Sequence, residues 1–295
     1  MSVDDLEFTE FPAPGREAWR AAVDKVLKGA DFDRRMVTRT ADGLVIQPLY
    51  GPDDGAPDPG VPGVAPYVRG TRAGEARWRT EQRQAHPDVA TANKQALDDL
   101  QKGMEAVRFV IADPLAPAAG GIVLGEPGDL AEALDGIMTD IAPVSLEAGS
   151  RGVAMARALL EHWSERDHGP EQAAGDLHVD PLATLARHGR LGQSIEAAFA
   201  DLASLVADTA AYTRVRPVGV DLRLAHDAGA GPSLELAVGL AHAAEVLRRL
   251  AAAGIEPDRA VAALTFLVPV DDDVFTGIAK LRALRRCWST MVAAV

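Results

Sequence analysis

The chain has one cysteine, Cys287, and few aromatic residues. A single cysteine excludes an internal disulfide, and no cluster of Cys and His has the spacing of a zinc site. Aromatic residues make up only 5% of the chain, against 47% hydrophobic residues in all. Packing must therefore rely on Ala, Leu and Val. The length of 295 residues is enough for one large domain or two small ones.

Positive charge is also scarce. The chain has 30 Lys and Arg against 43 Asp and Glu, a net charge of −13. This balance argues against sequence-independent binding to DNA or RNA, which needs a basic surface. It also means that any anionic ligand would need local arginines. No apolar run is long enough for a membrane span, and the start MSVDDLEFTE is too acidic for a signal peptide. We therefore expect a cytoplasmic protein without nucleic acid or membrane partners.

The first part of the chain reads as an arm. Residues 1–40 contain one amphipathic stretch, residues 16–28, with apolar side chains at helical spacing. A helix this short is marginal alone, so the arm should dock on something. Residues 44–50 predict a strand, and residues 51–64 are rich in Gly, Pro and Asp and predict an exposed loop.

Strands and helices alternate from about residue 89. This alternation predicts a parallel sheet with helices at its flanks. A doubly wound sheet and a TIM-type (β/α) barrel both fit, but the pattern gives only about five strands and a closed barrel needs eight. The segments VRFVIA and TFLVPV read as apolar on both faces. The predicted strands are residues 107–112, 142–148, 176–180, 216–225 and 265–270.

Two motifs offer candidate binding residues. In PYVRGT, Tyr67 supplies an aromatic face and Arg69 an anion-pairing fork, although an ordinary loop anchor would look the same. In DLRLAHDAGAG, Arg223, His226 and Asp227 follow a predicted strand, where side chains face an active-site mouth in parallel folds. His226 could be a general acid, or it could simply pair with a neighbouring carboxylate or carbonyl.

The remaining histidines are scattered. His178 alternates with apolar residues on a predicted strand and could point into a barrel, but a satisfied core histidine is the commoner case. We expect the others, in polar or helix-end contexts, to be solvated: His86, His162, His168 and His188.

Together these segments resemble the substrate barrel of the adenosylcobalamin-dependent methylmalonyl-CoA mutase family. The resemblance runs across nearly the whole chain, in the order and at the intervals of the N-terminal half of a mutase subunit. It carries Trp78 and Gln82 into the set of candidate substrate contacts. The matching segments are residues 19–29, 42–50, 63–71, 96–103, 226–231 and 280–288.

Key residues of the family's catalytic subunit are replaced. Its CoA-gripping arginine falls on Ala76, its strand-end glutamine on Val179, and its Tyr-His pair on Arg223 and Leu224. Leucine cannot donate a hydrogen bond to a thioester carbonyl. A histidine before Asx-Ala-Gly-Ala-Gly instead resembles the small, non-catalytic subunit, and His226 fits that pattern.

The resemblance implies a 1–40 arm followed by an incomplete (β/α) barrel over 41–295, without a cobalamin domain. It implies a structural partner of a catalytic subunit that interconverts methylmalonyl-CoA and succinyl-CoA, or a chain that self-associates. Adenosylcobalamin would belong to the complete complex and not to this chain. The alternative is a repurposed enzyme or acyl-CoA-binding protein that works without cobalamin through Arg223, His226 and Asp227. Convergence of these residues with Arg69 on one pocket would favour the alternative; dispersal would favour the structural role.

Overall fold

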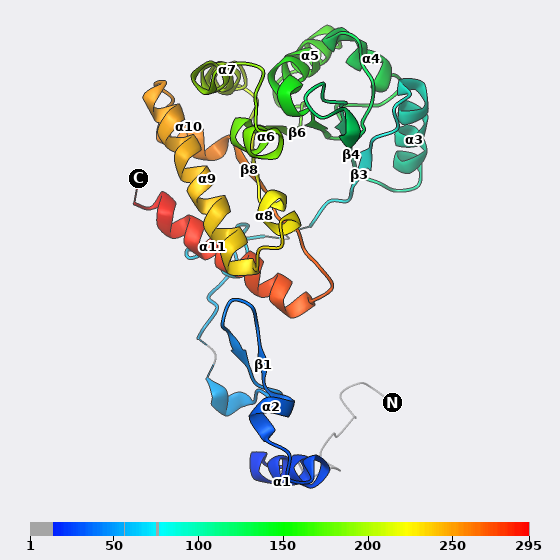
Figure 1. The fold of residues 1–295 in the computed structure, drawn as a ribbon. Coiled ribbons are helices and arrows are strands. Elements are labelled where there is room, and N and C mark those ends of the chain that lie inside the picture. Colours follow the sequence, from blue (N-terminus) through cyan, green and yellow to red (C-terminus); the bar gives the residue numbers. More distant parts are fainter. Residues whose placement is uncertain (1–13, 56, 75–76, 295) are drawn as a thin grey trace. The chain divides into compact units, whose positions relative to one another are not determined.

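A computed structural model describes residues 14–55, 57–74 and 77–294 (Figure 1). The chain divides into two compact units, residues 1–58 and 59–295, whereas the sequence places the end of the arm at residue 40. Ala76 lies outside the described residues. None of the helices in the described part of the chain is long and apolar enough to cross a membrane.

The first unit is built from short elements. Trp19 on the first helix meets the ring of Phe32 edge-to-face, with centroids 6.2 Å apart. No described residue from 14 to 58 is buried, so the described part of this unit forms no core of its own. The predicted strand 44–50 was too long, because only two of its residues pair. The elements are α1 (Arg16–Leu27), α2 (Phe32–Met36), the antiparallel pair β1 (Thr38–Arg39) and β2 (Val45–Ile46), and the 3₁₀ turn η3 (Pro52–Asp54).

The second unit contains parallel strands in the orders β3-β4-β5 and β6-β7-β8. The two sets adjoin at β5 and β6, where the Val144 N–H donates to the Ala174 carbonyl oxygen at 3.0 Å. A side chain at Gly175 would overlap the Val144 carbonyl, so this close approach requires glycine. The strands are β3 (Glu81–Gln84), β4 (Ala106–Val110), β5 (Val144–Glu147), β6 (Gly175–Val179), β7 (Val215–Asp221) and β8 (Leu264–Leu267).

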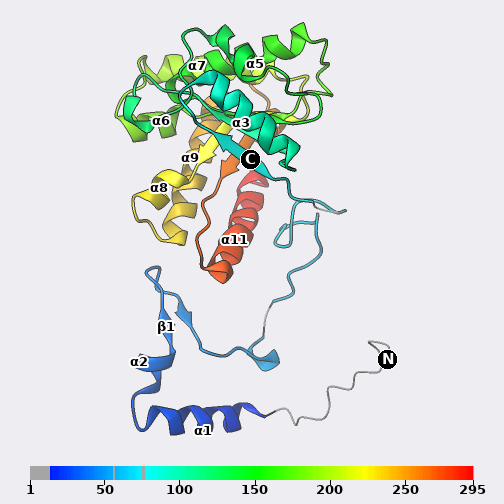
Figure 2. The same ribbon diagram turned by 90° about the vertical axis from the view of Figure 1, so that its right-hand side faces the viewer.

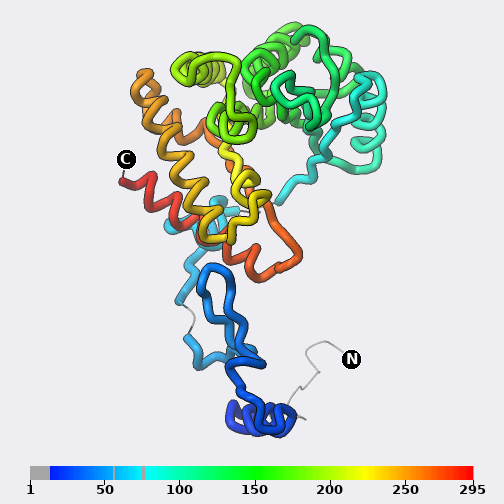
Figure 3. Tube along the Cα trace, viewed as in Figure 1, coloured from blue at the N-terminus to red at the C-terminus, as the bar shows by residue number. Residues whose placement is uncertain are grey.

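Helices connect the strands, and Figure 3 traces this alternation as one path from cyan to red. Helices α9 and α11 pack against each other (Figures 1 and 2). Trp288 of α11 lies edge-on to Phe266 of β8, with centroids 5.0 Å apart. The helices are α3 (Val89–Gln101), α4 (Leu130–Ala133), α5 (Gly152–Glu165), α6 (Pro181–His188), α7 (Ile195–Asp208), α8 (Arg223–Asp227), α9 (Pro232–Ala252), α10 (Pro257–Ala262) and α11 (Val274–Val292), with 3₁₀ turns η4 (Pro117–Ala119), η5 (Pro127–Asp129) and η6 (Gly149–Arg151).

The mixed α/β architecture with parallel strands is confirmed. The described residues form six parallel strands, one more than expected, and no closed sheet is seen. The extra strand, β3, has the sequence EQRQ, which carries no apolar signal. The predicted strand 216–225 was also too long: β7 ends at Asp221 and the next residues form α8.

One face of the strands is polar, contrary to the expectation of two apolar faces. On β4, Val107 and Phe109 are fully buried in the core that contains the helices, while Arg108 between them pairs with Glu147 of β5. On β8, Thr265 donates to Asp176 of β6 at 2.9 Å. The side chains of these strands therefore do alternate between two faces. One face packs against the helices, and the other carries charged residues that neutralise one another.

Candidate functional site

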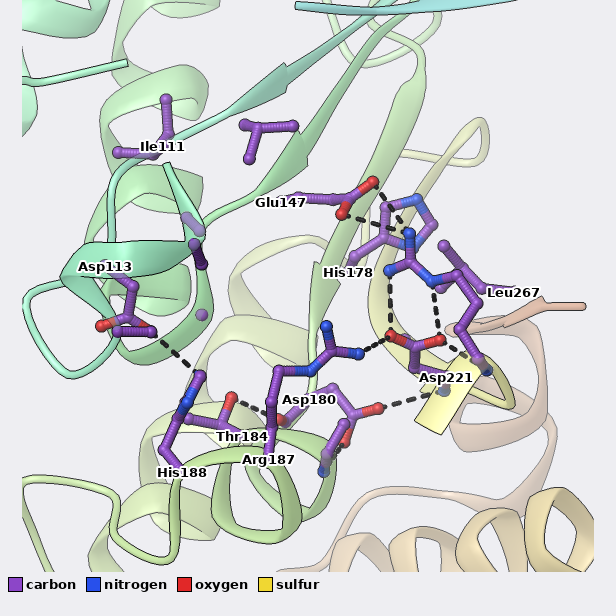
Figure 4. Close-up of a pocket in the computed structure, with 18 of the residues that line it drawn as sticks. Ile111, Asp113, Glu147, His178, Asp180, Thr184, Arg187, His188, Asp221 and Leu267 are labelled. Atoms are coloured by element: carbon purple, nitrogen blue, oxygen red, sulfur yellow. Dashed lines mark hydrogen bonds and ion pairs between the residues drawn. The ribbon is translucent and has the colours of Figure 1, made fainter. Parts of the chain in front are cut away.

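A small cavity of about 140 Å³ opens where the parallel strands end (Figure 4). Carboxyl ends of parallel strands are where ligand sites form in such folds. Helix α6 and the loop after β4 complete the wall. The polar residues that line it are Arg83, Asp113, Glu147, His178, Asp180, Thr184, Arg187, His188, Asp221 and Arg223.

Two carboxylates organise the arginines. Glu147 accepts from Arg108 and Arg223, each at 3.2 Å. Asp221 accepts from Arg223 through Nε at 2.8 Å and Nη2 at 2.9 Å, and from Arg187 at 3.1 Å. Burial alone would raise the pKa of Asp221, but the hydrogen bonds and charge of Arg223 hold it below its usual value. Asp221 is thus ionised, and both carboxylates already accept from arginines.

His178 projects into this layer from β6. Figure 4 shows its ring beside Glu147. Burial, and after it the charges of Arg108 and Arg223, lower the pKa of His178 to about 3, so the imidazole is neutral. Within the described part of the chain neither ring nitrogen has a hydrogen-bond partner, although both are buried. The expectation of a satisfied core histidine was therefore wrong.

Asp180 and Asp113 fix the wall of the cavity. Asp180 caps α6 by accepting from the Ala183 N–H at 2.8 Å, as the Asp-Pro pair predicts. Its second oxygen accepts from the Asp221 N–H at 3.2 Å, which ties β6 to β7. Asp113 accepts from the Ser150 hydroxyl at 2.5 Å, and His188 approaches it at 3.9 Å. Ser150 and His188 both face the aspartate, so the histidine is not placed to activate the serine.

The candidates from the PYVRGT part of the sequence lie elsewhere. Tyr67 belongs to a loop held on α11, where Arg285 donates to the carbonyl oxygens of Tyr67 at 2.9 Å and Val68 at 2.8 Å. Arg69 is exposed. Trp78 is 78% exposed, and Gln82 is an exposed residue of β3. None of Tyr67, Arg69, Trp78 and Gln82 lines the cavity.

The candidates after β7 separate. Arg223 lines the cavity together with His178. His226 turns to the far side of α8 and binds Glu235 of α9, Nδ1 to Oε1, at 2.8 Å. Asp227 is exposed at the end of α8. The helix, unlike the expected strand, sends these three side chains in different directions.

Several lining residues gave little sequence signal. Arg83 lies on the strand that the apolar pattern missed, and Glu147 and Asp221 are single acids at the ends of apolar strands. We expected the histidines in polar or helix-end contexts to be solvated. For His162 this was wrong, because the residue is only 5% exposed. Acids that end consecutive parallel strands are the signal that would have found Glu147 and Asp221.

A second cavity, of about 310 Å³, lies at the opposite, amino-terminal ends of the strands. It shares no lining residue with the first. Arg77 pairs with Glu105 there, while Arg214 and Arg216 bond backbone carbonyl oxygens. Arg108, Glu147 and His178 lie two residues beyond this cavity along β4, β5 and β6, toward the carboxyl ends of the strands.

Fold and site define an α/β protein of parallel strands with a layer of ion pairs between the strand ends. A family model described as methylmalonyl-CoA mutase matches residues 39–295. The chain therefore belongs to the methylmalonyl-CoA mutase family.

Named relatives refine this assignment. The small subunit of methylmalonyl-CoA mutase from Streptomyces virginiae is 36% identical over 95% of this chain and 45% of its own length. The small subunit from Propionibacterium freudenreichii subsp. shermanii is 31% identical over 95% of this chain and 44% of its own. The large subunit from Streptomyces virginiae is 25% identical over 98% of this chain and 42% of its own. The chain thus spans less than half of these relatives, and the small-subunit resemblance is confirmed.

Proposed function

We propose that this chain is a structural partner of a catalytic mutase subunit, in a complex that isomerises methylmalonyl-CoA and succinyl-CoA with adenosylcobalamin. The chain supplies assembly and not chemistry in this proposal. The names of the small-subunit relatives support it.

The observation that carries the proposal is the dispersal of the candidate ligand residues. Arg223 faces the cavity, His226 is engaged with Glu235, and Asp227 and Arg69 are exposed elsewhere. An acyl-CoA site built on these residues would need them to converge. Their separation supports the structural role over a repurposed enzyme acting through Arg223, His226 and Asp227.

The size of the strand-end cavity supports the same proposal. Its volume of about 140 Å³ is well below the roughly 300–1,000 Å³ of ordinary ligand pockets, and it accommodates neither a CoA ester nor a corrin ring. This cavity does not fit adenosylcobalamin, and we assign the cofactor to the catalytic partner.

The arm offers the surface for assembly. It buries no described residue, and Val26 on α1 is 78% exposed. An amphipathic helix gains most of its stability from packing against another surface. We propose that this surface belongs to the partner chain.

Co-expression with a catalytic mutase subunit of the same family tests the proposal. We expect a stable heteromer by light scattering, and mutase activity only in the complex. The isolated chain, given adenosylcobalamin, should form no succinyl-CoA and should leave the visible spectrum of the cofactor unchanged. Turnover by the isolated chain would overturn the structural role. A homo-oligomer that ignores the catalytic subunit would replace the proposed partner by a second copy.

A further inference from the structure

We propose that His178 and Arg187 form a binding site for a short carboxylate that also carries a hydroxyl or carbonyl oxygen. The site is the small cavity at the carboxyl ends of the strands. This role is separate from assembly, because the cavity walls all come from residues 83 to 267 of this chain.

The backbone at His178 is distorted in a way that aims its side chain. His178 has φ of +45°, a left-handed conformation that is rare for residues other than glycine. The register between β6 and β7 shifts between Asp176 and Val179, as at a β-bulge. Opposite it, a side chain at Gly219 would come within 3.1 Å of the His178 Cα. Bulges and strained residues recur where a side chain must be redirected at a functional site.

The imidazole has unused hydrogen-bonding capacity. A neutral ring has one N–H donor and one acceptor nitrogen. Both ring nitrogens of His178 are buried, and neither has a partner in the described residues. Leaving such groups unpaired costs free energy, so a strained backbone that holds them there indicates a molecule that pairs with them. A hydroxyl can do so as donor or acceptor, and a carbonyl oxygen as acceptor from the N–H.

Arg187 supplies unused hydrogen-bond donors to the cavity lining. The acids of the cavity already accept hydrogen bonds: Glu147 and Asp221 from arginines, Asp180 from two backbone N–H groups, and Asp113 from three donors of Ser150 and Leu115. Arg187 makes one contact among the described residues, through Nη2 to Asp221, and its side chain is 42% exposed. Its remaining N–H donors can take a carboxylate, the planar anion that a guanidinium fork matches best.

The size of the cavity limits the ligand. A volume of about 140 Å³ equals the liquid volume of roughly five waters. A carboxylate of two to four carbons fills that space, and a nucleotide does not.

Lactate and propionate separate the two recognition elements. Lactate has a carboxylate and a hydroxyl, whereas propionate has only the carboxylate. At saturating lactate we expect the melting temperature of the wild-type chain to rise by about 2–4 °C, and propionate to give less than half of that rise. Lactate should also shift the ring resonances of His178 in NMR spectra.

Three variants complete the test. His178→Asn removes the ring but tolerates the left-handed backbone, and Arg187→Met removes the fork from an exposed position. Both should lose the lactate response, while Arg190→Met, an exposed arginine outside the cavity, should keep it. If H178N does not fold, R187M and the wild-type ring resonances carry the test. An equal response to lactate in wild type and R187M, or to sodium chloride of the same ionic strength, would overturn the site.

Discussion

Glu235 and Lys280 form an ion pair in the interior of the second unit. Their Oε2 and Nζ atoms are 2.8 Å apart, and each side chain is only 2% exposed. The second carboxylate oxygen of Glu235 binds His226 at 2.8 Å. One acid on α9 therefore fastens both α8 and α11.

Removing the ammonium should destabilise the fold strongly. Lys280→Met leaves a buried carboxylate with only His226 as a partner. Loss of one member of a buried pair costs about 3–5 kcal/mol, and we expect the lower end because His226 remains. Urea unfolding of the two proteins measures the difference.

A double variant separates charge from packing. Glu235→Leu combined with Lys280→Met removes both charges and should recover much of the loss. Lys102→Met, which removes the exposed pair of Lys102 with Asp98, is the matched control and should unfold like wild type. If K280M also unfolds like wild type, the pair does not hold α11 on α9.

The junction of β5 and β6 depends on Gly175. Gly175→Ala places a methyl group on the Val144 carbonyl oxygen, so the two strands must separate. We expect a loss of more than about 3 kcal/mol, of the size seen when packing or backbone conformation is disrupted in a core. Gly189→Ala is the control, because Gly189 has a positive φ of +69° but open space around it. Its expected cost is roughly 1–2 kcal/mol, and equal losses in the two variants would show that strand separation is not the cause.

Apolar side chains of the arm should drive assembly. Trp19→Ser with Val26→Ser removes two side chains from α1, and each fully buried apolar side chain of this size contributes roughly 1.5–3 kcal/mol. We expect at least a hundredfold weaker association with the catalytic subunit and an unchanged melting temperature of the free chain. Sedimentation equilibrium measures the first quantity. Lys25→Ser, an exposed residue of the same helix, should leave association intact; unaltered binding by the double variant would mean that the arm does not dock.

Much of the fold was predictable because its signals are local. The predicted helix 16–28 matches α1, short apolar runs mark β4 and β8, and the predicted strands 142–148 and 176–180 contain most of β5 and β6. Asp180 and Pro181 stand at the start of α6 as N-cap and first helical residue, a pair typical of a helix start.

The errors have tertiary causes. Strand β3 is polar because its inward residues join the ion pairs of Arg108 and Glu147. Residues after Asp221 turn into α8 where Arg223 folds back on the Asp221 carboxylate. The aim of His178 depends on a bulge, and a strand pattern alone does not contain it.

His178 should make the fold sensitive to mild acid. Its pKa is about 3 in the folded chain against 6.5 for a free histidine, so the unfolded chain binds a proton between these pH values and the folded chain does not. The free energy of unfolding should therefore fall as the pH drops below about 6.5, by up to about 1.4 kcal/mol per pH unit. The loss due to His178 ends near pH 3, where the folded chain also binds the proton. His162, whose pKa is lowered by burial, adds to the same trend.

The measurement is the difference between wild type and His178→Asn in urea unfolding from pH 8 to pH 5. Subtraction removes the trend from His162 and from the acids, which both proteins share. The two curves should run parallel above pH 7, and below it the wild-type curve should fall relative to the His178→Asn curve, because only wild type loses the contribution of a neutral His178. Curves that stay parallel down to pH 5 would mean that the ring is protonated or solvated in the folded chain, and the site proposed around it would lose its neutral imidazole.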